Sequence, residues 1–248
     1  MYTYTRIISQ EFIQPLIRTC VIFLSDKDLL TMSLIVYGFP LSPFVRKLFF
    51  CLAEKGIDYQ LETVPPFNQP SWFREISPLG RIPAIKDGDL TLADSSVICQ
   101  YFEDKYPDLT KLLGKNAEQH AKVRWLEKYA DYELAPLTTF TVFLHRVVNP
   151  SMNKPCDEKT VQAALADKLP AHFDYLEQSL GHAEFFVDDN LSLADLAFTC
   201  QMINMEHAGE QLDNERWPNL AALFARIKAR PYMQALLQKE YQLLSSMK

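Results

Sequence analysis

Ser42 and Pro43 are the first residues in this chain whose types and spacing could do chemistry. They follow a short apolar run that ends at Gly38, and they precede a stretch with apolar residues at helical spacing. Serine is a preferred N-cap and proline fits the first helical position, so a helix is predicted to begin here. A serine hydroxyl at such a helix start can accept from a backbone N–H and donate its own proton to an anion. Ser42 is therefore predicted to be a helix cap and a candidate catalytic residue.

Two further turns carry candidate binding groups. Asp94 and Ser95 open another helix, where free N–H groups and the positive end of the helix dipole favour a carboxylate. An ordinary helix cap is the alternative for this pair. Ile82 precedes Pro83, and a cis peptide bond there would present the backbone N–H and C=O of Ile82 to an extended ligand. A trans proline at the first residue of a strand is the alternative for this turn.

The composition excludes several classes of protein. The chain has 248 residues, a formal net charge of -6 and no cluster of basic residues, so neither nucleic acid nor an anionic membrane is an expected partner. Its five cysteines are widely spread without a CxxC pair, and no histidine stands at a metal-ligand spacing. These features predict free thiols in a reducing, cytoplasmic compartment and no metal site.

The elements that must position the candidate residues follow in the order β-α-β-α-β-β-α. Apolar, β-prone runs and turn residues predict strands at 34–37 and 59–64 and a hairpin at 82–92. Capping residues and apolar spacing predict helices at 43–55, 72–76 and 95–106. This order predicts a small α/β domain of thioredoxin-like type over residues 33–107.

The rest of the chain has almost no strand-like segments. Residues 108–116 read as a linker, and 117–248 as an all-helical domain. Two of its predicted helical runs, 117–148 and 157–180, contain Pro136 and Pro170, which are expected to disturb them. Ser192 and Asp195 have the spacing of a capping box, with aspartate in place of glutamate.

The first 31 residues are treated separately because Phe12 to Leu24 is apolar. The run is too short and too interrupted for a transmembrane helix, which needs about 20 predominantly apolar residues. It also lacks a small-residue cleavage site of the kind that ends a signal peptide. We expect residues 1–31 to be an N-terminal extension that is not part of the fold, with Met32 as a start residue.

Four motifs in order resemble those of the cytosolic glutathione transferases over roughly residues 33 to 240. The turn from Ser42 to Arg46 looks like the serine-type active-site turn of tau-class and related bacterial enzymes. The segment from Ser77 to Pro83 is similar to the turn into the family's cis-proline strand, and Asp94-Ser95 resembles its acidic-serine pair. The capping box at Ser192 resembles the one in the family's helical domain.

The resemblance implies a glutathione transferase that uses glutathione as its co-substrate. Ser42 would stabilise the thiolate, and Ile82 and Pro83 would pair with the glutathione backbone. Asp94 and Ser95 would hold the γ-glutamyl end. Candidates for the glycyl carboxylate are Arg81, Gln69 and Asn68. An apolar pocket for a hydrophobic electrophile would be lined by Phe44, Tyr132, Phe140 and Phe143.

The resemblance also implies a homodimer, with the first domain of one subunit against the helical domain of the other. Three other functions remain open on this fold: glutathione-dependent peroxidase activity, thiol-disulfide reductase activity, and a non-catalytic role in ligand binding or protein interaction. The reductase is disfavoured because it would carry cysteine where this chain has Ser42. Cys51 lies about two helical turns further on and is expected to be a small buried apolar residue.

Overall fold

The computed structural model describes residues 34–247. The expected extension at 1–31, Met32 and Cys20 lie outside the described residues. None of the described helices is both long enough and apolar enough to cross a membrane.

The first half of the described chain has the predicted order of elements. The strands are β1 (Ile35–Gly38), β2 (Gln60–Thr63), β3 (Ala84–Asp87) and β4 (Leu90–Ala93). The helices are α1 (Pro43–Lys55), α2 (Phe73–Ile76) and α3 (Ser95–Lys105). The thioredoxin-like α/β fold predicted from the sequence is confirmed.

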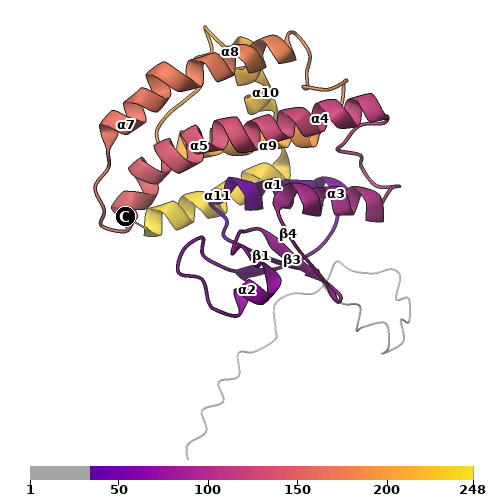
Figure 1. Cartoon of the computed structure of the whole chain (residues 1–248). Coiled ribbons are helices and arrows are strands. Elements are labelled where there is room, and N and C mark those ends of the chain that lie inside the picture. Colours follow the sequence, from indigo (N-terminus) through magenta and orange to yellow (C-terminus); the bar gives the residue numbers. More distant parts are fainter. Residues whose placement is uncertain (1–33, 248) are drawn as a thin grey trace, which may run out of the picture. The chain divides into compact units, whose positions relative to one another are not determined.

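The four strands form one mixed sheet in the order β2-β1-β3-β4. β1 is parallel to β2 and antiparallel to β3, which is in turn antiparallel to β4. Helices α1 and α3 cover the face of the sheet that points toward the helical half of the molecule, and α2 lies on the other face (Figure 1). The central strands β1 and β3 contain the buried residues of the sheet, whereas β2 is exposed.

Local signals in the sequence determine where α1 begins and ends. Ser42 has extended backbone angles and caps the helix, and Pro43 is its first residue. Gly56 adopts a left-handed conformation with φ of 65° and its N–H bonds back to the last turn, which ends the helix. Because only four residues separate the end of β1 from the start of α1, the N-terminus of the helix lies beside the end of that strand.

The second half is helical, as predicted. Its α-helices are α4 (Ala117–Tyr129), α5 (Ala135–Leu137), α6 (Asn149–Ser151), α7 (Glu158–Ala163), α8 (Leu169–Leu180), α9 (Leu193–His207), α10 (Pro218–Lys228) and α11 (Pro231–Ser246). Three π-helical segments connect several of them: η2 (Ala130–Leu134), η3 (Thr138–Val148) and η4 (Ala164–Lys168).

Two prolines explain where wide turns interrupt these helical runs. Pro136 and Pro170 each lie in the first turn of a new α-helix, directly after η2 and η4. Proline has no N–H to donate and its ring clashes with the carbonyl four residues back, so the preceding turn widens. The chain continues in the same general direction, and the predicted disturbance at both prolines is confirmed.

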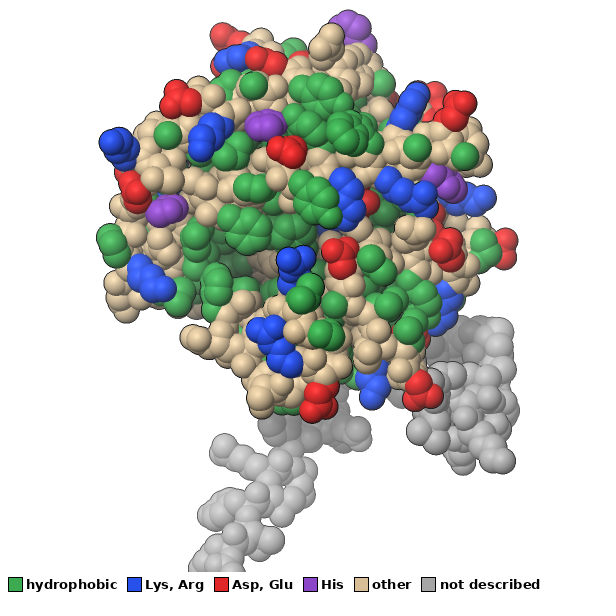
Figure 2. All heavy atoms as spheres, in the orientation of Figure 1, with side chains coloured by type: hydrophobic (Ala, Val, Ile, Leu, Met, Phe, Trp, Pro, Cys, Tyr) green, Lys and Arg blue, Asp and Glu red, His purple; other side chains and the backbone are tan. Residues whose placement is uncertain are grey.

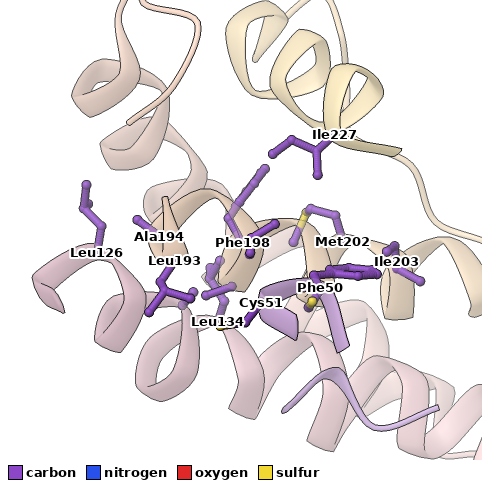
Figure 3. Packing of buried hydrophobic residues seen from close by; sticks show 14 of the residues in the cluster. Phe50, Cys51, Leu126, Leu134, Leu193, Ala194, Phe198, Met202, Ile203 and Ile227 are labelled. Atoms are coloured by element: carbon purple, nitrogen blue, oxygen red, sulfur yellow. The ribbon is translucent and has the colours of Figure 1, made fainter. Parts of the chain in front are cut away.

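Helix α9 forms the centre of the core and is buried along almost its whole length. The predicted capping box of Ser192 and Asp195 opens it. Phe50 and Cys51 of α1 belong to the same buried cluster as Phe198 and Met202 of α9, as Figure 3 shows. The α9 surface thus supports the helix that begins at Ser42.

Candidate active site

The register of the sheet brings the three candidate turns to one edge. Tyr37 pairs with Ala84, so Gly38 at the end of β1 lies next to Pro83. Ala84 also pairs with Ala93, so Pro83 lies next to Asp94 at the start of α3. The Ser42 turn, the Ile82-Pro83 turn and the Asp94-Ser95 turn therefore converge, although the first and the last are more than 50 residues apart in the sequence.

Ser42 is half-buried and its hydroxyl oxygen accepts a hydrogen bond from Val45 N at 3.4 Å. This distance is at the long end of the range for such bonds, so the cap is weak. Among the described residues the Ser42 hydroxyl donates to no acceptor, which leaves its proton available to a ligand. Gly38 is needed for this geometry, because a Cβ there would lie 2.6 Å from a methyl carbon of Val45.

The Ile82–Pro83 peptide bond is cis, as the resemblance implied. The turn before it is held by Ser77, whose hydroxyl donates to Arg81 O at 2.8 Å and accepts from Arg81 N at 3.0 Å. Among the described residues no hydrogen bond involves the backbone of Ile82. Its N–H and C=O are therefore open to a partner.

Asp94 caps α3, with its carboxylate accepting from Ser96 N at 2.9 Å and from Val97 N at 3.2 Å. Its φ of 81° is unusual for a residue other than glycine. Ser95 is 4% exposed, and its hydroxyl has no hydrogen-bond partner within residues 34–247. A small polar ligand at the start of α3 could supply one.

The residues suggested for the glycyl carboxylate lie on the adjoining loops. Arg81 and Asn68 are exposed, while Gln69 is half-buried. The side-chain nitrogen of Gln69 is buried without a partner in the described part of the chain. Among these three side chains, Gln69 is therefore the one with a buried donor that has no hydrogen bond within residues 34–247.

Two of the four aromatic residues predicted for an electrophile pocket come together. The rings of Phe44, in α1, and Phe140, in η3, are stacked with centroids 6.2 Å apart. Phe140 is 56% exposed, whereas Phe143 is buried in the core. Tyr132 is 65% exposed, with Lys128 Nζ 5.3 Å from its ring centroid. Figure 2 shows hydrophobic side chains gathered around a hollow on the face of the molecule that Figure 1 presents.

Two cavities lie away from these turns. One of about 270 Å³ lies among α8, α9 and α10, and another of about 430 Å³ lies between the end of α1 and α11. Neither is lined by Ser42. The candidate site is thus an open edge of the sheet, distinct from both.

The sequence analysis missed a buried ionic cluster directly behind the site. Lys47 Nζ lies 2.8 Å from Glu127, 2.7 Å from Asp131 and 3.1 Å from Ser96 Oγ. Burial by itself lowers the pKa of Lys47, but the two carboxylates outweigh it and raise that pKa above its ordinary value. Burial also raises the pKa of Asp131. The cluster ties α1 and the start of α3 to α4 and η2.

Arg46 is the second buried charge that the sequence did not reveal. Its guanidinium forms a two-pronged ion pair with Glu240 of α11, at 2.7 and 2.8 Å. Burial raises the pKa of Glu240, but Arg46 and then His207 outweigh it and lower that pKa. The partner lies 194 residues away, so no local pattern could identify it.

Known protein families match both halves of the chain. Residues 36–111 match the family described as glutathione S-transferase, N-terminal domain, and residues 143–240 match glutathione S-transferase, C-terminal domain. Glutathione S-transferase F10 of Arabidopsis thaliana is 34% identical over 175 residues, which cover 67% of this chain and 78% of that protein. Glutathione S-transferase 4 of Zea mays is 32% identical, covering 82% of this chain and 91% of the relative.

Solved structures agree with these matches. A glutathione S-transferase from Rhodospirillum rubrum F11 superimposes with a TM-score of 0.75 at 27% identity, covering 83% of this chain and 92% of the other. Glutathione transferase F7 from Populus trichocarpa gives a TM-score of 0.73 at 26% identity, covering 83% and 98%.

Proposed function

The chain belongs to the cytosolic glutathione transferase family, and we propose that it ionises the glutathione thiol at Ser42 and adds it to a hydrophobic electrophile. The observation that carries this proposal is the meeting of three turns at one edge of the sheet. Each turn offers polar groups that other described residues do not use.

Glutathione would bind in an extended form along this edge. The open backbone groups of Ile82 suit an extended peptide, because they can pair with it as a neighbouring strand would. The start of α3, with the Ser95 hydroxyl, suits the γ-glutamyl α-carboxylate, and Asp94 would face its amine. At the other end the unpaired amide of Gln69 supports it as a donor to the glycyl carboxylate, with Arg81 as the charged alternative.

The thiol needs help to react because its ordinary pKa is about 8.5, which leaves only a few per cent as thiolate at neutral pH. Lowering that pKa by about 2 units requires a preference for the thiolate of about 2.7 kcal/mol. One hydrogen bond to a charged acceptor contributes about 1.5 to 3 kcal/mol, and a helix N-terminus about 0.3 to 1 kcal/mol. A hydrogen bond donated by Ser42 and the N-terminus of α1 can therefore together supply the free energy that this pKa shift requires.

The electrophile would lie against the stacked rings of Phe44 and Phe140. These two side chains come from α1 and η3, so the pocket would join the two halves of the chain. Tyr132 stays a proposed part of this lining. Phe143 does not contribute to it, because it is buried in the core.

The remaining properties are proposed from the family alone: a homodimer, placed in the cytoplasm, that uses glutathione as co-substrate and acts without a metal. A thiol-disulfide reductase is less well supported, because Cys51 is fully buried within α1 and cannot reach the site as a nucleophile. Peroxidase activity and ligand carriage without turnover are the alternatives that the assay below separates.

The test is an activity panel with glutathione and three co-substrates: an aryl halide, an organic hydroperoxide and a mixed disulfide. We expect the wild-type protein to turn over the aryl halide, and we expect the rate to fall tenfold or more in Ser42→Ala. Ser42→Cys should gain disulfide reduction, because a cysteine at a helix N-terminus can form a mixed disulfide. Turnover of the hydroperoxide alone would indicate a peroxidase instead of a conjugating enzyme. Glutathione binding without turnover of any co-substrate would indicate a ligand carrier.

A further inference from the structure

Arg46 and Glu240 form a fully buried ion pair between α1 and α11, with 0% of either side chain exposed. Arg46 Nη1 also donates to Cys200 O at 2.9 Å and to Asn204 Oδ1 at 3.0 Å. All three guanidinium nitrogens of Arg46 thus donate hydrogen bonds to protein acceptors. A pair so fully desolvated keeps its electric field, because no solvent screens it.

The pair is close to the site along the chain. Arg46 N donates to Ser42 O at 2.9 Å, so Arg46 lies in the first turn of α1, four residues after the candidate catalytic serine. The positive charge belongs to a side chain of α1 itself, whereas the carboxylate belongs to α11 and is bound by the guanidinium. The positive end therefore belongs to the catalytic helix and the negative end does not.

Other charged or titratable groups lie around the pair. His207 of α9 places Nε2 2.7 Å from Glu240, while its Nδ1 is buried without a partner among residues 34–247. Lys47, next along α1, lies in a cluster with Lys128, Glu127 and Asp131, which holds two charges of each sign. Tyr241 meets the ring of His207 edge-on.

We infer that Arg46 and Glu240 are a positioning pair that sets the acidity of the thiol held at Ser42. The guanidinium favours the thiolate through its field, and Glu240 holds the guanidinium in place while attenuating its charge. The inference rests on the proposed function, since it concerns the same thiol. It makes the C-terminal helix α11 part of the catalytic apparatus without any contact to substrate.

The first test is Glu240→Gln, which keeps the shape and one acceptor for Arg46 but removes the negative charge. By Coulomb's law, one unpaired charge at about 10 Å in a medium of effective dielectric constant about 20 shifts a pKa by about one unit. The pKa of bound glutathione is expected to fall by at least about half a unit, a threefold gain in the ratio of thiolate to thiol. If Glu240 had only a structural role, Glu240→Gln would leave the pKa of bound glutathione unchanged or raise it.

The second test is the double variant Arg46→Met/Glu240→Leu, which replaces the whole pair by apolar side chains of similar size. Such replacements often fold as well as the original pair, so this variant also serves if Glu240→Gln does not fold. Without the guanidinium field the thiol pKa is expected to rise by about 0.3 unit or more. The two variants should therefore move the pKa in opposite directions.

The chain offers a matched control at the other end of α1. Glu54 pairs with Arg230, at the start of α11, with Arg230 Nε 2.6 Å from the carboxylate. It lies 12 residues beyond Ser42, about 18 Å along the helix, so its charge should have little effect at the site. Glu54→Gln removes one ion pair between the same two segments and is expected to leave the thiol pKa unchanged.

All variants are compared with the wild type by titrating the thiolate absorbance of bound glutathione, after thermal unfolding confirms a folded protein. Opposite shifts in the two pair variants with no shift in Glu54→Gln would support the inference. No shift in either pair variant, or shifts of the same sign, would overturn it. If the wild type does not ionise bound glutathione, the proposed function fails instead, which this titration shows separately.

Discussion

Asp195→Asn is expected to change how the stability of the protein depends on pH. Asp195 is buried at the start of α9, where its carboxylate accepts from Phe186 N at 2.8 Å and from Ser192 N at 2.8 Å. Burial raises the pKa of Asp195 to about 6, and the hydrogen bonds from Phe186 and Ser192 only partly oppose this. Asparagine has nearly the same shape but no proton to gain in this range.

The sign follows from comparing the folded and unfolded states. An unfolded aspartate has a pKa of about 3.8, so between pH 4 and 6 the folded protein binds the proton more tightly. The stability from this group is therefore fully present below pH 4 and is lost as the pH rises through 6. A difference of about 2.2 pKa units corresponds to about 3 kcal/mol of unfolding free energy.

The assay is urea unfolding of both proteins at several pH values from 4 to 7. Other carboxylates contribute to both curves alike, so the difference between wild type and Asp195→Asn isolates this group. As the pH rises from 4 to 7, the wild type should lose about 2.5 kcal/mol of unfolding free energy relative to Asp195→Asn. A difference that stays constant across this range would refute the reasoning about burial at Asp195.

Three further outcomes are expected. Ser95→Ala should weaken glutathione binding by about 1 to 3 kcal/mol in calorimetry, because it removes a hydrogen bond to a charged group, and unchanged affinity would remove Ser95 from the site. Lys47→Met should lower the free energy of unfolding by about 3 to 5 kcal/mol, because it leaves Glu127 and Asp131 buried without their cation; the exposed Lys122→Met is the control, and equal stabilities would contradict this. Sedimentation equilibrium at micromolar concentration should give twice the chain mass of 28.6 kDa, and a mass near that of one chain would rule out the dimer.

Local signals made most of the fold predictable from the sequence. Ser42 and Gly56 mark the two ends of α1, and Asp94 marks the start of α3. Ser192 and Asp195 form the expected capping box. Each of these residues acts on backbone groups within a few positions, so its effect can be read from the neighbouring sequence.

The interior of the site could not be predicted in the same way. Arg46 and Lys47 stand on a helix whose apolar face was assigned from neighbouring leucine and phenylalanine residues, yet both are fully buried. Their partners, Glu240 and Glu127, lie 194 and 80 residues away. Burial of a charge depends on a long-range partner, and one sequence holds no record of which carboxylate that is.

The pocket shows the same limit. Four aromatic residues were expected to line it, and spacing alone could not tell exposed rings from buried ones. Phe44 and Phe140 meet because α1 and η3 pack together, whereas Phe143 turns into the core beside α9. Which face of a helix meets solvent depends on its neighbours.

The central claim is that Ser42 ionises the thiol of bound glutathione. Its most direct test is the thiolate absorbance of bound glutathione against pH in wild type and Ser42→Ala. The account predicts a wild-type thiol pKa about 2 units below 8.5, and a rise of at least about one unit in Ser42→Ala, since one donor of about 1.4 kcal/mol is lost. Equal pKa values in the two proteins would show that Ser42 is only a helix cap and would contradict the account.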